Sequence, residues 1–294
     1  MSESLLDNEF LQRLEYLYLV VRGQFSGRVS AERLSKKFGI GSEFADYRSY
    51  AAGDDFRYVD WATFARRDQL FVKLFTEEQT TNLYFILDVS NSMSLGSPEK
   101  LLFAKKVAAA LGYVGLANLD PVTIVSFDAK MRPDARTFQG KGQSRYMMKH
   151  LDGLQPQGER TAMGEALRQF VTRYTGRGLV VVLSDFLDRG GYEEALRLLR
   201  YHRHQLLAIQ VNDREELAPS FTGDLELVDS ESGEQITMKT TPDLVAGYQR
   251  RLKEHYAELV RLCKLMRWPH IEAVTDMKFD DLIFEVFRRG GVLR

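Results

Sequence analysis

The chain has very little cysteine: Cys263 is the only one among 294 residues. A single cysteine cannot form an internal disulfide, which suits a reducing compartment, and we expect a cytoplasmic protein. The sequence also lacks an apolar run of about 18 residues, the length that reads as a membrane-spanning helix. No membrane span is therefore predicted.

An excess of one charge sign is also missing, because 40 basic residues stand against 41 acidic ones. A chain so balanced has no overall field to attract nucleic acid or anionic lipid, so we expect no nucleic-acid partner. The hydrophobic share of 44% and the charged share of 28% are ordinary for a soluble globular protein. Repeats and low-complexity stretches are absent as well, which argues against disorder.

From about residue 82 onward, short apolar runs typical of buried strands alternate with stretches spaced like amphipathic helices. The predicted strands are 83–87, 122–127, 179–183, 206–211 and 270–274, with a short hairpin arm at 131–137. The predicted helices are 97–118, with Ser97 as its N-cap, and 161–174, 192–202, 242–265 and 280–288. This alternation predicts an α/β fold: a doubly wound, mostly parallel sheet with helices on both faces.

Other segments stand outside this alternation. Residues 224–239 read as two short strands, which we interpret as a hairpin insert near 214–241. Residues 1–24 have the spacing of an amphipathic helix, which we expect to pack on the body rather than to dock a partner or act as a secretory signal. We therefore divide the chain into residues 1–80, an N-terminal helix and extended segment packed on the body, and residues 81–294, the α/β domain.

Oxygen-bearing side chains follow two of the predicted buried strands. Asp88, Ser90 and Ser92 come directly after the first strand, and Asp185 comes directly after the strand at 179–183. Thr161 begins a predicted helix. Because ligands of such sheets bind at the carboxyl ends of the strands, we expect these five side chains to meet at a solvent-facing edge.

This set of two carboxylates and three hydroxyls suits a hard divalent cation, Mg²⁺ in particular, with Mn²⁺ or Ca²⁺ as other candidates. Two carboxylates neutralise the ion but leave it a strong Lewis acid that can accept one more carboxylate from outside. The alternative is that Ser90 and Ser92 only cap the following helix, with Asp88 and Asp185 as solvated loop acids. One cysteine and scattered histidines argue against zinc.

The same pieces resemble the metal-ion-dependent adhesion site of von Willebrand factor A domains: L-D-V-S-N-S-M at 87–93, E-R-T-A-M at 159–163 and L-S-D-F at 183–186. In that family the serines and the threonine contact the metal, the aspartates act directly or through water, and an acidic residue of a partner protein completes the coordination. The resemblance covers residues 80 to 290. It implies the von Willebrand A fold and the metal ligands Asp88, Ser90, Ser92, Thr161 and Asp185.

A second resemblance lies in the amino-terminal part. E-F at 43–44, Y-R-S-Y at 47–50, G-D-D-F-R-Y-V-D-W at 53–61 and A-R at 65–66 are similar to the signature of domain-of-unknown-function family fifty-eight. That bacterial family places this segment before a von Willebrand A-type domain, and its members commonly accompany MoxR-type AAA+ ATPases. Many of them carry two membrane spans at the amino end, so this chain resembles the shorter, soluble sort.

Within this segment, Arg48, Arg57 and Arg66 lie among several aspartates. Internal salt bridges that tie the segment to the body are the expected explanation of that pattern, and a partner-facing surface is the alternative. The aromatic side chains Tyr58, Trp61 and Phe64 are interpreted as core anchors rather than ligand contacts.

Together these features predict a metal-dependent protein–protein interaction module rather than an enzyme, an adaptor for a MoxR-type AAA+ ATPase in protein assembly or remodelling. No catalytic residue is predicted. The alternative is an Mg²⁺-dependent phosphohydrolase of the haloacid-dehalogenase type, which also places an aspartate after a buried strand. That class needs a second acid two residues on as proton donor, and this chain has Ser90 there.

Overall fold

A computed structural model of the chain describes residues 10–19, 43–76, 81–157, 161–188, 190–219, 223–228 and 235–290. The chain divides into two compact units. One comprises Met1–Leu19 with Thr81–Leu293, and the other comprises Val20–Thr80 with Arg294. The predicted division near residue 80 placed the N-terminal helix, packed on the body, in the first segment. The described helix over residues 10–19 lies in the same unit as the α/β domain.

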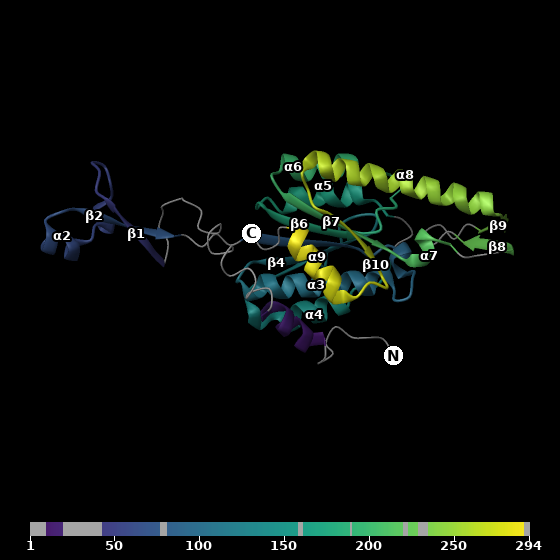
Figure 1. Cartoon of the computed structure of the whole chain (residues 1–294), viewed down its shortest axis with the longest axis horizontal. Coiled ribbons are helices and arrows are strands. Elements are labelled where there is room, and N and C mark those ends of the chain that lie inside the picture. Colours follow the sequence, from purple (N-terminus) through teal and green to yellow (C-terminus); the bar gives the residue numbers. More distant parts are fainter. Residues whose placement is uncertain are drawn as a thin grey trace. The chain divides into compact units, whose positions relative to one another are not determined.

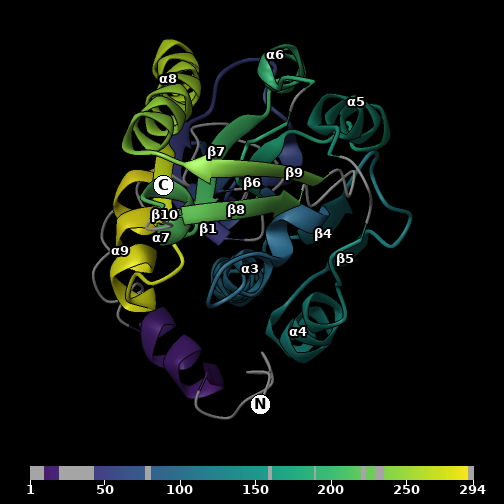
Figure 2. The ribbon, with the colours of Figure 1, turned by 90° about the vertical axis from the view of Figure 1, so that its right-hand side faces the viewer.

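The larger unit is built on a six-stranded sheet with the order β10-β7-β6-β3-β4-β5 (Figures 1 and 2). Its strands are β3 (Asn82–Asp88), β4 (Val122–Phe127), β5 (Arg136–Phe138), β6 (Gly178–Ser184), β7 (Gln205–Asn212) and β10 (His270–Val274). Every neighbouring pair is parallel except β4 and β5. The predicted α/β fold is confirmed, and the predicted arm at 131–137 supplies the antiparallel edge strand β5.

Helices cover both faces of this sheet (Figure 2). On one face lie α3 (Lys100–Ala117), α4 (Ser144–Asp152) and α9 (Phe279–Gly290), and on the other lie α5 (Met163–Arg173), α6 (Glu193–Tyr201) and α8 (Pro242–Met266). The apolar strands require cover on both sides. Tyr84 and Ile86 of β3 join the core beneath α5, α6 and α8, while Phe85 and Leu87 are buried on the opposite face.

The predicted start of α3 is wrong. We expected Ser97 to cap a helix beginning at Pro98, but α3 begins at Lys100, after a turn that includes a cis peptide bond before Pro98. The amide of Ser97 instead donates to the Asp213 carboxylate (3.3 Å). Because this hydrogen bond keeps Ser97 in the turn, the helix begins only at Lys100. Helix α4 was not predicted.

The helix over residues 10–19 packs on the larger unit. Leu14 and Leu17 are buried, and Tyr18 makes an edge-on ring contact with Tyr113 of α3 at 6.3 Å between centroids. This confirms the predicted amphipathic helix over that range. The remaining residues of the predicted 1–24 segment lie outside the described residues.

The predicted hairpin insert consists of the antiparallel strands β8 (Gly223–Val228) and β9 (Gln235–Thr240). A short helix, α7 (Arg214–Leu217), links β7 to this insert. In Figure 1 the hairpin and α7 lie at the same end of the sheet. This is the end at which β7 finishes, so the insert lies on the side of the carboxyl ends of the parallel strands.

The smaller unit pairs β1 (Glu43–Ser49) antiparallel with β2 (Phe71–Thr76), with the helices η1 (Phe56–Tyr58) and α2 (Trp61–Arg67) between them. Arg48 pairs with Asp54 (2.7 Å) and Arg57 with Asp55 (2.6 Å), so these two arginines form salt bridges within the segment itself, and the expected tie to the body stays a prediction. The prediction of Trp61 as a core anchor is wrong, because it is 56% exposed. Trp61 begins α2, and only one face of so short a helix can be covered.

Asp60 organises this small unit from a nearly buried position. Its carboxylate caps α2 by accepting from the amides of Ala62 and Thr63, and it also accepts from the Tyr47 hydroxyl at 2.7 Å. One side chain therefore ties β1 to the start of α2. Across the described parts of both units, no helix combines the length and apolar character needed to cross a membrane.

Candidate functional site

Asp88 ends β3 and is 0% exposed. Its Oδ1 accepts from the Ser90 amide at 3.0 Å, and its Oδ2 accepts from the Ser184 hydroxyl at 2.7 Å. The expectation of a solvent-facing edge is wrong for this group, because neighbouring loops close over the strand end. Burial first, and the negative charge of Asp185 second, raise the pKa of Asp88 to about 7 against the lowering effect of the serine hydrogen bonds.

Ser90 and Ser92 lie in the turn after Asp88, with their hydroxyl oxygens 3.1 Å apart. Ser90 precedes the short helix η2 (Asn91–Ser94), but its side chain makes no capping hydrogen bond, and α3 begins after Glu99. Asp88 and Asp185 are both buried. The alternative interpretation, in which the serines cap the next helix and the aspartates are solvated, therefore fails for Ser90 and for both acids.

Asp185 follows β6, which is the neighbour of β3 in the sheet, and is 2% exposed. The chain order reverses between these two strands, because β3 leads to β4 on one side while β6 leads to β7 on the other. Ligands of doubly wound sheets bind beyond the carboxyl ends of strands at such a point. The Oδ1 atom of Asp185 accepts from the Leu187 amide at 3.1 Å, which fixes the carboxylate within its loop.

Thr161 is nearly buried just before α5. The two residues after it anchor its segment: the amide of Ala162 donates to the Asp128 carbonyl (3.0 Å), and the amide of Met163 donates to the Asp188 carboxylate (2.8 Å). Asp128 follows β4 and Asp188 follows β6, and these strands flank β3. The segment that carries Thr161 is therefore tied to both neighbours of the strand that ends in Asp88.

Lys100, the first residue of α3, is part of this site, and the sequence analysis missed it. Its side chain is 0% exposed, and its Nζ donates to Asp185 Oδ2 at 2.8 Å and to Glu216 Oε1 at 2.6 Å. Burial by itself would lower the pKa of Lys100, but the charges of Asp185 and Glu216 outweigh it, and the pKa lies above its usual value. A lysine in the first turn of the helix that follows the serine loop was the available signal.

Glu216 is held in place by the capping box of α7. Its second carboxylate oxygen accepts from the Asp213 amide at 3.0 Å, and Asp213 accepts in turn from the Thr275 hydroxyl at 2.9 Å. The acid that faces Lys100 is therefore fixed by elements after β7 and β10. The ends of three parallel strands thus contribute to one polar cluster.

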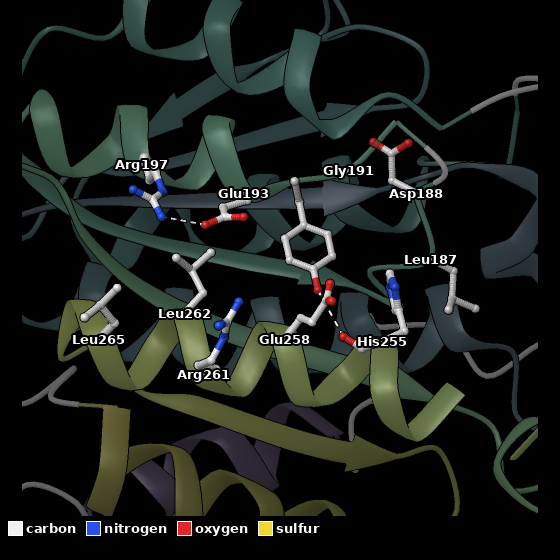
Figure 3. A pocket seen from close by; sticks show the side chains of 11 residues that line it. Leu187, Asp188, Gly191, Glu193, Arg197, His255, Glu258, Arg261, Leu262 and Leu265 are labelled. Atoms are coloured by element: carbon white, nitrogen blue, oxygen red, sulfur yellow. Dashed lines mark hydrogen bonds and ion pairs between the residues drawn. The ribbon is translucent and has the colours of Figure 1, made fainter. Parts of the chain in front are cut away.

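A cavity of about 710 Å³ adjoins the Asp185 loop, between α6 and α8 (Figure 3). Leu187 and Asp188 of that loop line it, and so does His255 of α8. His255 Nε2 lies 2.7 Å from the Phe186 carbonyl; since a carbonyl only accepts, this nitrogen carries the proton. The backbone of Phe186 has φ +57°, a conformation that residues other than glycine rarely adopt, and the contact with His255 helps to hold it.

The donor set is consistent with a hard cation. Among the described residues, no group of three or more histidine, cysteine or acidic side chains could by itself hold a metal ion. A cation here would depend on Asp88, Asp185 and the hydroxyls, which are the oxygen ligands that Mg²⁺ and Mn²⁺ prefer. The buried Asp88 carboxylate also favours a nearby positive charge, since burial otherwise favours its protonated form.

The phosphohydrolase alternative gains no support from this geometry. Ser90 stands where a proton-donating acid is required. Asp188 does not serve as a second free acid, because both of its carboxylate oxygens accept backbone amides, from Met163 and Gly190. Asp188 therefore has a structural role, in which it holds the segment before α5 and the loop after β6 in place.

Comparison with known proteins identifies relatives over most of the chain. The family described as "Protein of unknown function DUF58" matches residues 46–258. Uncharacterized protein Rv1480 of Mycobacterium tuberculosis is 29% identical over 295 residues, covering 98% of this chain and 92% of that protein. Both matches extend across the signature segment and the α/β domain.

Solved structures with a similar fold are more distant. The conserved hypothetical protein BatB from Bacteroides thetaiotaomicron is 16% identical with a TM-score of 0.45, covering 71% of this chain and 97% of that chain. A von Willebrand factor type A protein from Catenulispora acidiphila is 16% identical with a TM-score of 0.41, covering 86% of this chain and 51% of that chain. Similarity at this level gives no information about what this chain binds.

Proposed function

This chain belongs to the DUF58 family, and we propose that it is a metal-dependent protein–protein interaction module. The observation that carries the proposal is the meeting of Asp88 and Asp185 at the switch point of the sheet, beside the hydroxyls of Ser90 and Ser92. Burying two acidic side chains costs free energy, and these two lie at the point where such sheets bind ligands, which favours a functional role for them.

In this proposal Asp88, Ser90, Ser92, Thr161 and Asp185 hold one Mg²⁺ or Mn²⁺ ion, with Ca²⁺ as a further candidate. The bound ion supplies a Lewis-acidic position that an acidic residue of a partner protein can occupy. Asp88 is oriented for this role by Ser184 and by the Ser90 amide. Since Asp88 is protonated more easily than an exposed acid, the ion also keeps it in its charged form.

The partner in this proposal is a MoxR-type AAA+ ATPase, for which the chain acts as an adaptor in protein assembly or remodelling. Support comes from the family signature at residues 43–66, which resembles that of proteins accompanying such ATPases. Binding rather than catalysis is favoured because Ser90 and the engaged Asp188 leave no obvious proton donor for phosphate release.

The test uses a matched pair of serines in η2. Ser92→Ala removes a proposed ligand, whereas Ser94→Ala removes an exposed hydroxyl that donates only to the Asn91 carbonyl. In Mn²⁺ titration by calorimetry, Ser92→Ala should bind the ion at least about tenfold more weakly than wild type, and Ser94→Ala should bind it like wild type. Capture of the ATPase from the native host should follow the same order and should cease in EDTA.

Three outcomes would contradict the proposal. Identical metal affinities of the two serine variants would show that Ser92 is not a metal ligand and would contradict the proposed metal site. Capture that persists in EDTA, with a metal site proven by calorimetry, would separate the metal from the interaction. Mg²⁺-dependent hydrolysis of an aryl phosphate that disappears in Asp88→Asn would favour the enzyme.

A further inference from the structure

Lys100 is the unexpected charge in the candidate site. It has no exposed surface, and its Nζ bridges the carboxylates of Asp185 and Glu216 at 2.8 and 2.6 Å. A buried ion pair of this kind carries a large desolvation cost and is weak evidence for a purely stabilising role. A positive charge fixed beside a proposed metal ligand weakens the electrostatic attraction between that ligand and a metal ion.

The charge balance of the cluster gives the direction of this effect. When a metal is bound, the carboxylates of Asp88, Asp185 and Glu216 supply three negative charges, and Lys100, which pairs with the last two, offsets one of them. A divalent cation then brings the loaded site close to neutrality. Without the lysine charge, the empty site would attract the metal more strongly, but the loaded site would keep a negative charge and repel an incoming carboxylate.

We infer that Lys100 is a built-in cation that tunes this site for partner binding: it weakens the hold on the metal so that the loaded site can accept a carboxylate from outside. This inference rests on the proposed function, since it concerns the same site. It assigns Lys100 a specificity-determining role, with no contact to the partner required. Glu216 contributes by sharing the lysine, so that Asp185 keeps part of its charge for the metal.

The chain offers a matched control on the same helix. Lys105 is also nearly buried in α3, but its Nζ donates to the backbone carbonyls of Asp152 and Leu154 rather than to a carboxylate. Lys100→Met and Lys105→Met therefore remove the same charge from two buried positions, of which only one faces the site. The variant Lys100→Met combined with Glu216→Gln leaves Asp185 without its ion pair but does not leave the partly buried Glu216 unpaired as well, which guards against loss of folding.

The experiment measures two affinities in the full chain. In Mn²⁺ calorimetry, Lys100→Met should bind the ion about tenfold more tightly than wild type. Its combination with Glu216→Gln has the net charge of wild type but frees Asp185 from its ion pair, so it should bind the ion more tightly than wild type by a smaller factor. Lys105→Met should match wild type. In water-proton relaxation of the Mn²⁺-loaded proteins, acetate should displace bound water from Lys100→Met only at higher concentrations than from wild type.

The outcomes separate this inference from the proposed function. Wild type that binds Mn²⁺ with the same affinity as folded Lys100→Met, or acetate binding that is equal in the two, would overturn the role of Lys100 and leave the metal site standing. Wild type that binds no Mn²⁺ while Lys100→Met binds it tightly would remove the proposed function, because the lysine would then replace the metal. Binding by neither protein would overturn both.

Discussion

At the scale of single residues, Asp88 has the most unusual environment in the site. Its carboxylate is fully buried, and its pKa is raised to about 7 by burial and by the charge of Asp185. The folded metal-free protein therefore holds a proton on Asp88 at pH values where the unfolded chain has released it. Linkage then requires that this group favours folding most at low pH and that its contribution is lost as pH rises from about 4 to 7.

Asp88→Asn should consequently stabilise the metal-free protein at pH 8 and have little effect at pH 5. The asparagine keeps the shape but has no charge to bury, and the gain at pH 8 is on the order of 2–4 kcal/mol. Thermal unfolding in EDTA at the two pH values measures it, with Mn²⁺ expected to reverse the order by stabilising only wild type. A difference between the two proteins that does not change with pH would show that Asp88 does not titrate in this range.

The residues of the site differ in how far sequence could predict them. Asp88, Ser90, Ser92 and Asp185 follow apolar strands closely, so strand prediction alone places them at one edge of the sheet. Lys100 could not be assigned in this way, because its partner Glu216 lies 116 positions away and belongs to an insert. A contact of that kind is set by how α7 packs at the end of β7, which no local pattern records.

At the scale of elements, apolar strands and long helices were predictable, and short capped elements were not. The start of α3 depends on a tertiary contact from Asp213, which overrides the local preference of Ser97 for a cap. Helix α2 depends on Asp60, whose carboxylate also accepts from Tyr47 thirteen positions earlier in the chain. The Tyr47 hydrogen bond is the main cause that lowers the pKa of Asp60 to about 2.

Asp60→Asn should therefore destabilise the smaller unit at neutral pH. A carboxyl with a lowered pKa in the folded state contributes stability above its unfolded value near 3.8, and this contribution is lost as pH falls toward 2. The difference between Asp60→Asn and wild type should thus shrink below pH 4. In a Trp268→Phe background, Trp61 is the remaining tryptophan of the two in the chain, and its fluorescence reports unfolding of this unit.

Asp46→Asn is the matched control, because Asp46 is exposed on β1 and accepts only from the neighbouring Tyr47 amide. It should unfold like wild type at every pH. An equal loss of stability in both variants would mean that any charge change in β1 or α2 destabilises the unit, and the capping role of Asp60 would then be wrong.

At the scale of the whole molecule, the chain holds the candidate metal site in one compact unit and the family signature in another. The sequence placed a boundary near residue 80 from a change in composition. The N-terminal amphipathic helix was expected to pack on the body, but the residues that it contacts could not be named from the sequence, because contacts such as Tyr18 with Tyr113 join positions far apart in the chain. A partner that engages both units would contact a surface on each of them.

Arg57 offers a test of the second surface. Its side chain is 79% exposed, pairs with Asp55 two positions away and lies 6.0 Å from the ring centre of the neighbouring Tyr58. Exposed contacts of this kind contribute little to stability. Arg57→Ala should leave thermal unfolding and Mn²⁺ affinity unchanged while weakening capture of the ATPase. Exposed Arg145 of α4 provides the control, and Arg145→Ala should bind the ATPase like wild type.

Combining Arg57→Ala with Thr161→Ala then asks whether the two units act independently on the partner. Thr161→Ala removes one proposed metal ligand and little volume, and Thr161→Ser should retain most binding because it keeps the oxygen. If each unit makes its own contact, the losses in binding free energy should add in the double variant, as they do for sites that act independently. A double variant no weaker than Thr161→Ala alone would mean that Arg57 acts only once the metal site is engaged. Full binding by Arg57→Ala would restrict the interaction to the metal-bearing unit and leave the exposed arginine without a role in it.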